Sequence, residues 1–323
     1  MKHFLPFALL LVSFHSFAQG PIKIYDANKM RGLGPLLKKG TLVVEDGKEI
    51  GNNVSANAIV LSEQFTKIQK YYMDIHNRNS WDDKGALIEA TVNIHGLAGL
   101  MGLKQNAAWV GAQEGVPSDI SNRFVFGKGK RKGLDNFEKA LDVVGHEYTH
   151  AIISTTSNLD YEGQSGALNE HLADVFGILI NIHFNNPALP YLIGHTVLPN
   201  YTSHSKGLRD MENPEKGLSV QPGHMDDLKT AKFKKYDEGC MATSENDHCG
   251  VHILSGIPNK MAVFIIKKVS ADEASALFYN VMTKRLNSKS NFKDYRLALL
   301  EECKEMSQNV CVAVELALKE VGL

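Results

Sequence analysis

The feature that most constrains the fold is a pair of helical segments that carry metal-binding residue types at a spacing of four. The first segment, Asp142 to Ile153, contains the sequence His146-Glu147-Tyr148-Thr149-His150. Side chains at i and i+4 lie on one face of a helix, so both imidazoles can bind one tetrahedral ion, and zinc suits nitrogen ligands. Glu147 is adjacent to the first histidine and can reach a metal-bound water, which is the general-base position of a zinc peptidase.

A second helical segment, Gly166 to Asp174, supplies carboxylates. A catalytic zinc site uses three protein ligands and keeps one position open. Glu170 and Asp174 are four residues apart, so one carboxylate can bind the metal while the other orients a ligand histidine. His171 points about 100° away from Glu170 around the helix, which favours Glu170 as the ligand. The alternative interpretation is a surface helix with two solvated histidines.

Taken together, these segments resemble the thermolysin family of zinc endopeptidases. The resemblance rests first on His146 to His150 followed by Asn169-Glu170 and Asp174, and it extends over roughly residues 60 to 323. Further matching positions are Asn106-Ala107-Ala108-Trp109, Tyr161, Arg209 and the segment Asp247 to Gly256 with His252.

The resemblance implies an α+β fold of two domains, with the zinc site in the cleft between them. The β-rich N-terminal domain is expected over residues 19–155, ending in the H-E-x-x-H helix, and the mainly helical domain over 156–323. Apolar periodicity agrees with this division. It predicts β hairpins in 19–60, a strand at 87–95, glycine-rich loops at 111–135, and helices at 61–79, 137–154, 166–185, 256–267, 271–286, 291–306 and 309–321.

The resemblance assigns His146, His150 and Glu170 as the ligands of one catalytic zinc ion. Asp174 is expected to orient His146 through a hydrogen bond, and Asn169 belongs to the same layer of residues behind the ligands. These five residues form the predicted metal centre.

The same resemblance assigns the catalytic groups. Glu147 would take a proton from the metal-activated water and deliver it to the leaving amine. Tyr161 and His252 would donate hydrogen bonds to the developing oxyanion, and Asp247 would fix the tautomer of His252. Arg209 would bind a backbone carbonyl of the substrate.

The resemblance also implies substrate contacts along one edge strand and in one apolar pocket. Asn106 and the Ala107 carbonyl would bind the peptide backbone, and Trp109 is a further candidate contact, with core packing as its alternative. The primed-side pocket would be lined by Val143, Ile193, Val197 and Leu208. Such a pocket predicts cleavage on the amino side of Leu, Phe, Ile or Val, with modest discrimination because one methylene is worth about 1 to 3 kcal/mol.

The paired calcium site of the family is the main departure. Asp142 matches one of its acidic residues, but the other positions are Asn181, Leu192 and His195. Calcium needs an oxygen-rich, anionic cage. We therefore predict that this double site is missing or much weakened.

Residues 1–18 have the pattern of a secretory signal peptide. A basic start precedes the apolar run Phe4 to Val12, and Ser16-Phe17-Ala18 suits cleavage after Ala18. A membrane span needs about 20 apolar residues, so no stable membrane insertion is expected. We expect a secreted or periplasmic protein. Only about 40 residues separate Ala18 from the first family-like segment, too few for the long prosegment usual in secreted members.

Export also favours disulfides among the four cysteines. Sequence proximity suggests Cys240 with Cys249 and Cys303 with Cys311, although four cysteines permit three connectivities.

The overall charge indicates which kinds of molecule the protein can bind. The chain has 35 Lys and Arg against 36 Asp and Glu, which removes the electrostatic case for nucleic acid. The sequence therefore predicts a monomeric exported zinc metalloendopeptidase that acts on peptides or proteins. The alternatives are a zinc-stabilised binding or effector protein without general proteolytic activity, and a narrow-specificity hydrolase of cell-wall peptides.

Overall fold

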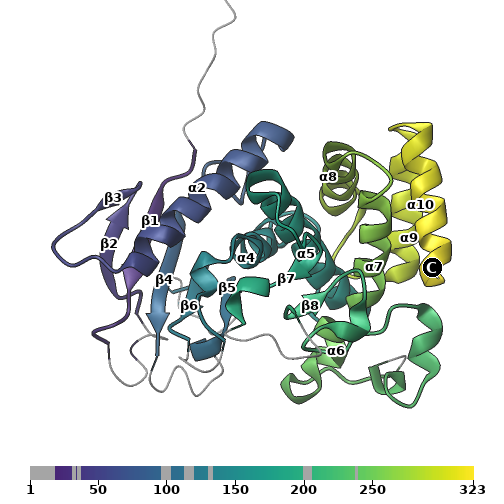
Figure 1. The fold of residues 1–323 in the computed structure, drawn as a ribbon, viewed down its shortest axis with the longest axis horizontal. Helices are drawn as coiled ribbons and strands as arrows, with labels where there is room; N and C mark the ends of the chain where they lie inside the picture. Colours follow the sequence, from purple (N-terminus) through teal and green to yellow (C-terminus); the bar gives the residue numbers. More distant parts are fainter. Residues whose placement is uncertain are drawn as a thin grey trace, which may run out of the picture.

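The N-terminal half of the chain forms a six-stranded mixed sheet with the order β3-β2-β1-β4-β6-β5 (Figure 1). Strand β4 pairs in parallel with β1 and β6, and the other pairs are antiparallel. The strands are β1 (Ile22–Asp26), β2 (Thr41–Glu45), β3 (Lys48–Glu49), β4 (Ile88–Ile94), β5 (Ala107–Val110) and β6 (Arg123–Gly127). The computed structural model describes residues 19–30, 34, 38–95, 103–112, 120–129, 134–198, 206–236 and 239–323.

The entry to the sheet is the predicted hairpin. Strands β2 and β3 turn at Asp46 and Gly47, whose φ angles are 47° and 75°. Two-residue turns with positive φ at both positions match the twist of the flanking strands. Helix α2 (Ala56–His76) then crosses the sheet and returns the chain to β4, because parallel strands need a long connection. Its inner face buries apolar side chains such as Leu61 and Phe65 against the strands.

The prediction that glycine-rich loops dominate residues 111–135 missed strand β6, which lies within that range. All five residues of β6 are buried between β4 and β5. Its Phe124 ring stacks on Tyr148 with a centroid distance of 5.9 Å and also contacts Phe65 at 4.9 Å. The three apolar residues between Arg123 and Gly127 are too few for periodicity to identify a strand.

Two buried helices, α4 (Leu141–Ser154) and α5 (Gly163–Asn185), pack closely in the centre of the molecule. A Cβ atom on Gly177 would lie 2.5 Å from the carbonyl oxygen of Asp142, and one on Gly145 would lie 3.4 Å from Gly177 Cα. Glycine permits this approach because it has no side chain. The contact fixes the spacing of the helix faces that carry the predicted metal ligands.

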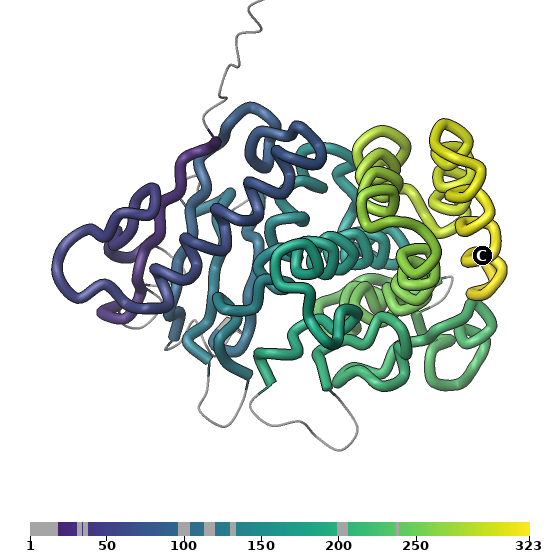
Figure 2. The backbone as a smooth tube through the Cα atoms, turned by 45° about the horizontal axis from the view of Figure 1, so that its top comes forward, coloured from purple at the N-terminus to yellow at the C-terminus, as the bar shows by residue number. Residues whose placement is uncertain are grey.

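The C-terminal half is a group of helices beside α5, coloured green to yellow in Figures 1 and 2. They are α6 (Asp247–Leu254), α7 (Gly256–Ile266), α8 (Ala271–Asn280), α9 (Phe292–Lys304) and α10 (Gln308–Val321), with a π-helical turn at Val281–Arg285. Two short strands, β7 (Leu192–Ile193) and β8 (Arg209–Asp210), pair between α5 and α6. Disulfides form between Cys240 and Cys249 and between Cys303 and Cys311, as sequence proximity suggested.

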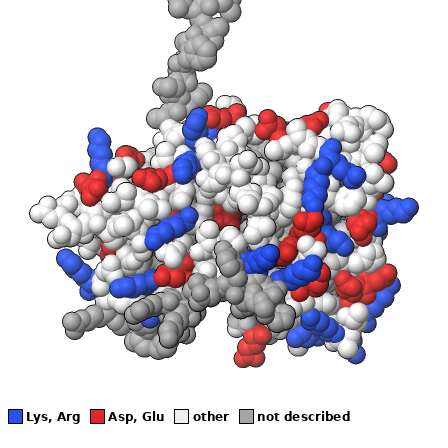
Figure 3. All heavy atoms as spheres, viewed as in Figure 1, with Lys and Arg blue, Asp and Glu red and all other residues white. Residues whose placement is uncertain are grey.

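A large hydrophobic core joins the two halves, extending from Ile22 in β1 to Val321 in α10. The stretch Ser244–Ile266 is long and apolar enough to span a bilayer, but 78% of its hydrophobic window is buried inside the protein, as in a core helix. On the face shown in Figure 3, basic and acidic side chains are interspersed. The predicted signal peptide, residues 1–18, lies outside the described residues. The structure confirms the fold class, with a β-sheet domain followed by a helical domain.

Candidate metal centre and active site

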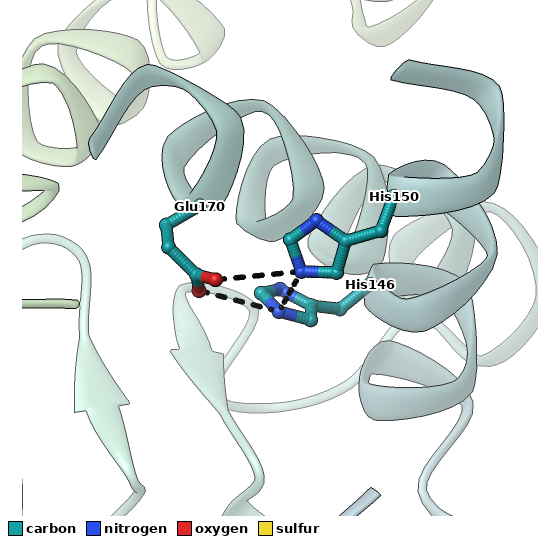
Figure 4. A group of neighbouring side chains, drawn as sticks. All are labelled: His146, His150 and Glu170. Atoms are coloured by element: carbon teal, nitrogen blue, oxygen red, sulfur yellow. Dashed lines mark hydrogen bonds and ion pairs between the residues drawn. The ribbon is translucent and has the colours of Figure 1, made fainter. Parts of the chain in front are cut away.

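The side chains of His146, His150 and Glu170 converge on one point between α4 and α5 (Figure 4). One ligand atom from each lies within 4.8 Å of the others. The Nε2 atoms of the two histidines are 2.9 Å apart, and the Glu170 oxygens lie 3.4 Å from His146 Nε2 and 3.5 Å from His150 Nε2. The i and i+4 spacing on α4 brings the two imidazoles to one face, and the close contact with α5 adds the carboxylate.

Both histidines are oriented through their Nδ1 atoms. His146 Nδ1 lies 2.8 Å from Asp174 Oδ1, and His150 Nδ1 lies 2.7 Å from Asn169 Oδ1. Because these oxygens are acceptors, each Nδ1 carries the proton and donates it. The Nε2 atoms are therefore the ring nitrogens that face the site, where a cation would bind in place of a proton.

The chemistry of this group fits a zinc ion. Oxygen Oε2 of Glu170 is buried without a hydrogen-bond partner, which is costly unless something binds there. Burial raises the pKa of Glu170, but His252, His150 and His146 outweigh it and hold that pKa well below its usual range. Burial likewise lowers the pKa of His146, but the Asp174 and Glu170 carboxylates outweigh it and raise that pKa to about 10. The site thus gathers negative charge around nitrogen and oxygen donors that suit zinc.

Behind His146 lies a buried hydrogen-bond network that the sequence interpretation missed. Asp174 accepts two bonds from Arg209, at 2.7 and 2.5 Å, and one from Asn259 Nδ2 at 2.8 Å. Asn259 Oδ1 in turn accepts from His171 Nδ1 at 2.8 Å, and the other ring nitrogen of His171 bonds to Tyr295 at 2.7 Å. His171 therefore faces α7 and α9, and Glu170 is the carboxylate that lies beside the two histidines.

Glu147 lies on the opposite side of the ligands, against the edge strand β5. Its Oε2 accepts a hydrogen bond of 2.8 Å from the backbone N–H of Trp109. The Asn106 carbonyl accepts a hydrogen bond from the Gly127 N–H at 2.9 Å, so the backbone polar groups of Asn106 point toward β6. The backbone N–H of Trp109 points the other way, out from the edge of the sheet. Backbone groups alternate along a strand, which turns the N–H and C=O of Ala107 outward as well.

Tyr161 and His252 approach the metal ligands from the C-terminal half. The Tyr161 hydroxyl donates to Glu170 Oε1 and lies 3.2 Å from His252 Nε2. The other ring nitrogen of His252 lies 2.6 Å from Asp247 Oδ1. Burial lowers the pKa of His252, but Glu170 and Asp247 outweigh it and raise the pKa, which favours the protonated, donating form.

These groups face a cleft of about 900 Å³ that runs between the sheet and the helical half. Among the predicted residues, its lining includes Asn106, Ala107, Trp109, Val143, His146, Glu147, His150, Tyr161, Asn169, Glu170, Ile193, Leu208, Arg209 and His252. Val197 is not among the residues that line this cleft, and its side chain packs in the core. Trp81 and His248 also line the cleft, although the sequence singled out neither as a site residue. The Trp81 ring lies 5.3 Å from that of Trp109.

Of the four positions that the resemblance assigns to the family's calcium site, only Asp142 is acidic. The buried Asp142 carboxylate accepts a 2.7 Å hydrogen bond from the Gly194 backbone N–H, and burial raises its pKa. Asn181 bonds to Asn185, Leu192 is buried in β7, and His195 Nδ1 bonds to the Lys206 carbonyl. The weakened calcium site stays a prediction.

The site combines His146, His150 and Glu170 with the hydrogen-bonded Glu147 on the wall of an open cleft. This arrangement is typical of metallopeptidases. Two family models together match nearly the whole chain. The model described as "Thermolysin metallopeptidase, catalytic domain" matches residues 13–154, and "Thermolysin metallopeptidase, alpha-helical domain" matches residues 157–323. The chain belongs to the thermolysin family of metallopeptidases.

Individual relatives agree with this assignment. Bacillolysin of Bacillus amyloliquefaciens is 32% identical over 88% of this chain, which spans 48% of that protein. Protease PrtS of Photorhabdus sp. (strain Az29) is 31% identical over 93% of this chain and 76% of its own length. Among solved structures, the precursor of protealysin, a metalloproteinase from Serratia proteamaculans, superposes with a TM-score of 0.75 at 26% identity, covering 94% of this chain and 88% of that one.

Proposed function

We propose that this protein is an exported zinc endopeptidase that hydrolyses peptides or proteins in its cleft. The observation that carries the proposal is the placement of Glu147, which is held by the Trp109 N–H on the cleft wall beside the three converging ligands. A site that only stabilised the fold would not need an oriented carboxylate next to its open side.

Zinc held by His146, His150 and Glu170 would act as a Lewis acid toward the peptide carbonyl and would lower the pKa of a water molecule. Glu147 accepts the proton of the attacking water and passes it to the leaving amine. The bond from Trp109 keeps the Glu147 carboxylate at the position where this proton transfer occurs.

Tyr161 and His252 stabilise the oxyanion, since both side chains lie beside Glu170 and can donate into the cleft. Asp247 holds the donating tautomer of His252. The outward-facing backbone of Ala107, with Asn106, binds the substrate as an added strand, and Arg209 binds a substrate carbonyl.

Specificity follows from the aliphatic side chains Val143, Ile193 and Leu208, which line the cleft near Arg209. We propose cleavage on the amino side of bulky apolar residues. A peptide library would test this by sequencing the new amino termini. Products that begin mainly with charged residues would contradict the apolar pocket.

The decisive experiment compares the wild-type chain with Glu147→Gln in hydrolysis of a quenched fluorescent peptide. We expect a loss of kcat of about 10²- to 10⁴-fold, because the general base is removed while the ligands stay. Bound zinc, measured by atomic absorption, is expected to remain unchanged. Equal inactivity of both zinc-loaded proteins would instead favour a binding function.

The proposal includes export, no stable membrane insertion and a monomeric state. Export is supported by the signal-like residues 1–18 and by the two disulfides, since oxidising compartments favour such bonds. The division into domains at residues 19–155 and 156–323 is part of the same proposal.

A further inference from the structure

The loop from Cys240 to Cys249 ends directly before the segment that carries His252. The disulfide closes this loop, with Cys249 buried and Cys240 half-buried. Within the loop, Thr243 and Asn246 hydrogen-bond to each other's backbone N–H groups, and Asn246 Oδ1 also accepts from Cys249 N–H at 2.9 Å. The disulfide and these hydrogen bonds therefore fix the backbone of the loop where it leads into the residues that follow.

The chain leaves this loop through a left-handed turn. Asp247, His248, Cys249 and Gly250 have φ angles of 56°, 50°, 65° and 75°. Glycine adopts this conformation readily, but the side chain of any other residue crowds its own backbone there. Three of the four residues are not glycine, so surrounding structure has to hold them in place.

This turn places two groups of the active site. It directs the Asp247 carboxylate back onto His252, where it accepts from the backbone N–H at 2.9 Å and lies 2.6 Å from Nδ1. His252 Nε2 then lies 3.4 Å from Glu170 Oε1. A turn of the opposite hand would carry Asp247 away from His252, and His252 would lose its fixed orientation in the cleft.

We propose that the Cys240–Cys249 disulfide is a positioning device for Asp247 and His252, because it holds Cys249 in the left-handed conformation on which their geometry depends. The proposal rests on the proposed function. The zinc ligands lie on α4 and α5, which this disulfide does not join. Opening the bond should therefore lower turnover and leave zinc binding intact.

The test uses paired substitutions at the two cysteines. In the Cys240→Ser, Cys249→Ala protein we expect kcat to fall by about 10- to 100-fold, with zinc content unchanged and KM changed much less, because a misplaced transition-state donor affects turnover. In Cys240→Ser, Cys249→Gly we expect most of the kcat to return, because glycine takes the left-handed conformation without a cross-link. This rescue separates a conformational role from a general loss of stability.

The second disulfide supplies a matched control. Cys303 and Cys311 are 8 positions apart in the sequence, against 9 for Cys240 and Cys249. They join α9 to α10, and neither residue lines the cleft. Cys303→Ser, Cys311→Ala is expected to lower the melting temperature and keep kcat. This variant retains one disulfide, so its reduction by a phosphine opens the Cys240–Cys249 bond alone, and kcat should then fall and recover on reoxidation.

Two results would overturn the proposal: a Cys249→Ala protein with wild-type kcat, or equal losses with alanine and glycine at position 249. If the alanine variant does not fold, the reduction experiment decides, and unchanged kcat in the fully reduced control variant rejects the proposal. An oxidised wild-type chain that binds zinc but cleaves no peptide would instead reject the proposed function.

Discussion

His146 and His150 are each held by a different kind of acceptor. His146 bonds to Asp174, which is itself fixed by Arg209 and Asn259. His150 bonds to Asn169, whose amide also donates to the Leu159 carbonyl at 3.1 Å. The orientation of His150 thus depends on a single neutral side chain, which makes Asn169 the more informative residue to change.

Replacement of Asn169 by alanine is expected to weaken zinc affinity by about 10- to 100-fold, because His150 loses the partner that fixes its ring. Competition with a chelator of known affinity measures the change. Asn181→Ala is the control, since Asn181 lies on the same helix and bonds to Asn185 away from the metal ligands. Equal affinities for the two variants would contradict the assigned role of Asn169.

At the scale of single residues, a contact could be predicted from the sequence only where its partners are close together in the chain. The ligands on α4 could be predicted because the helix repeat places i and i+4 on one face. The bonds of His171 could not, because its partners Asn259 and Tyr295 are 88 and 124 residues away on other helices. The support of Glu147 by Trp109 likewise depends on how β5 packs against α4.

At the scale of elements, the distance between α4 and α5 is set by Gly177. Substitution by alanine would favour the helical conformation by about 1 kcal/mol. The new Cβ, however, would lie 2.5 Å from a backbone oxygen of α4. Overpacking typically costs about 1 to 3 kcal/mol. We therefore expect Gly177→Ala to lower the free energy of unfolding, and urea denaturation of the zinc-loaded protein measures this.

Gly145→Ala is the matched comparison on the facing helix. Its Cβ would first meet the tip of the Ile180 side chain at 3.1 Å, which can move more easily than backbone. The expected destabilisation is smaller than for Gly177→Ala. The reverse order of the two variants would show that the backbone contact does not set the helix spacing.

Long helices could be predicted from the sequence more accurately than short strands. Long helices such as α5 and α10 repeat their apolar pattern over several turns, and their bounds lie within a few residues of those expected. Strand β6 was not predicted, because it has only three apolar residues between Arg123 and Gly127, too few to show a period.

At the scale of the whole molecule, we expect stability not to depend on calcium. The buried Asp142 carboxylate is already satisfied by the Gly194 N–H, and the neighbouring positions lack the anionic oxygens that calcium needs. The melting temperature of the zinc-loaded protein should be the same with calcium and with EGTA. A large drop in the melting temperature in EGTA would contradict the predicted weakening of the calcium site.

The two edges of the sheet differ in a way that affects how the protein behaves in concentrated solution. Long, flat, exposed edge strands are templates for aggregation. Strand β3 avoids this by its length of two residues and by its exposed charges, Lys48 and Glu49. Strand β5 has outward-facing backbone groups, but it lies within the cleft wall, where Glu147 already takes the Trp109 N–H. Under the proposed function, we therefore expect one edge of the sheet to accept a single extended substrate chain, and we expect neither edge to pair with another copy of the protein.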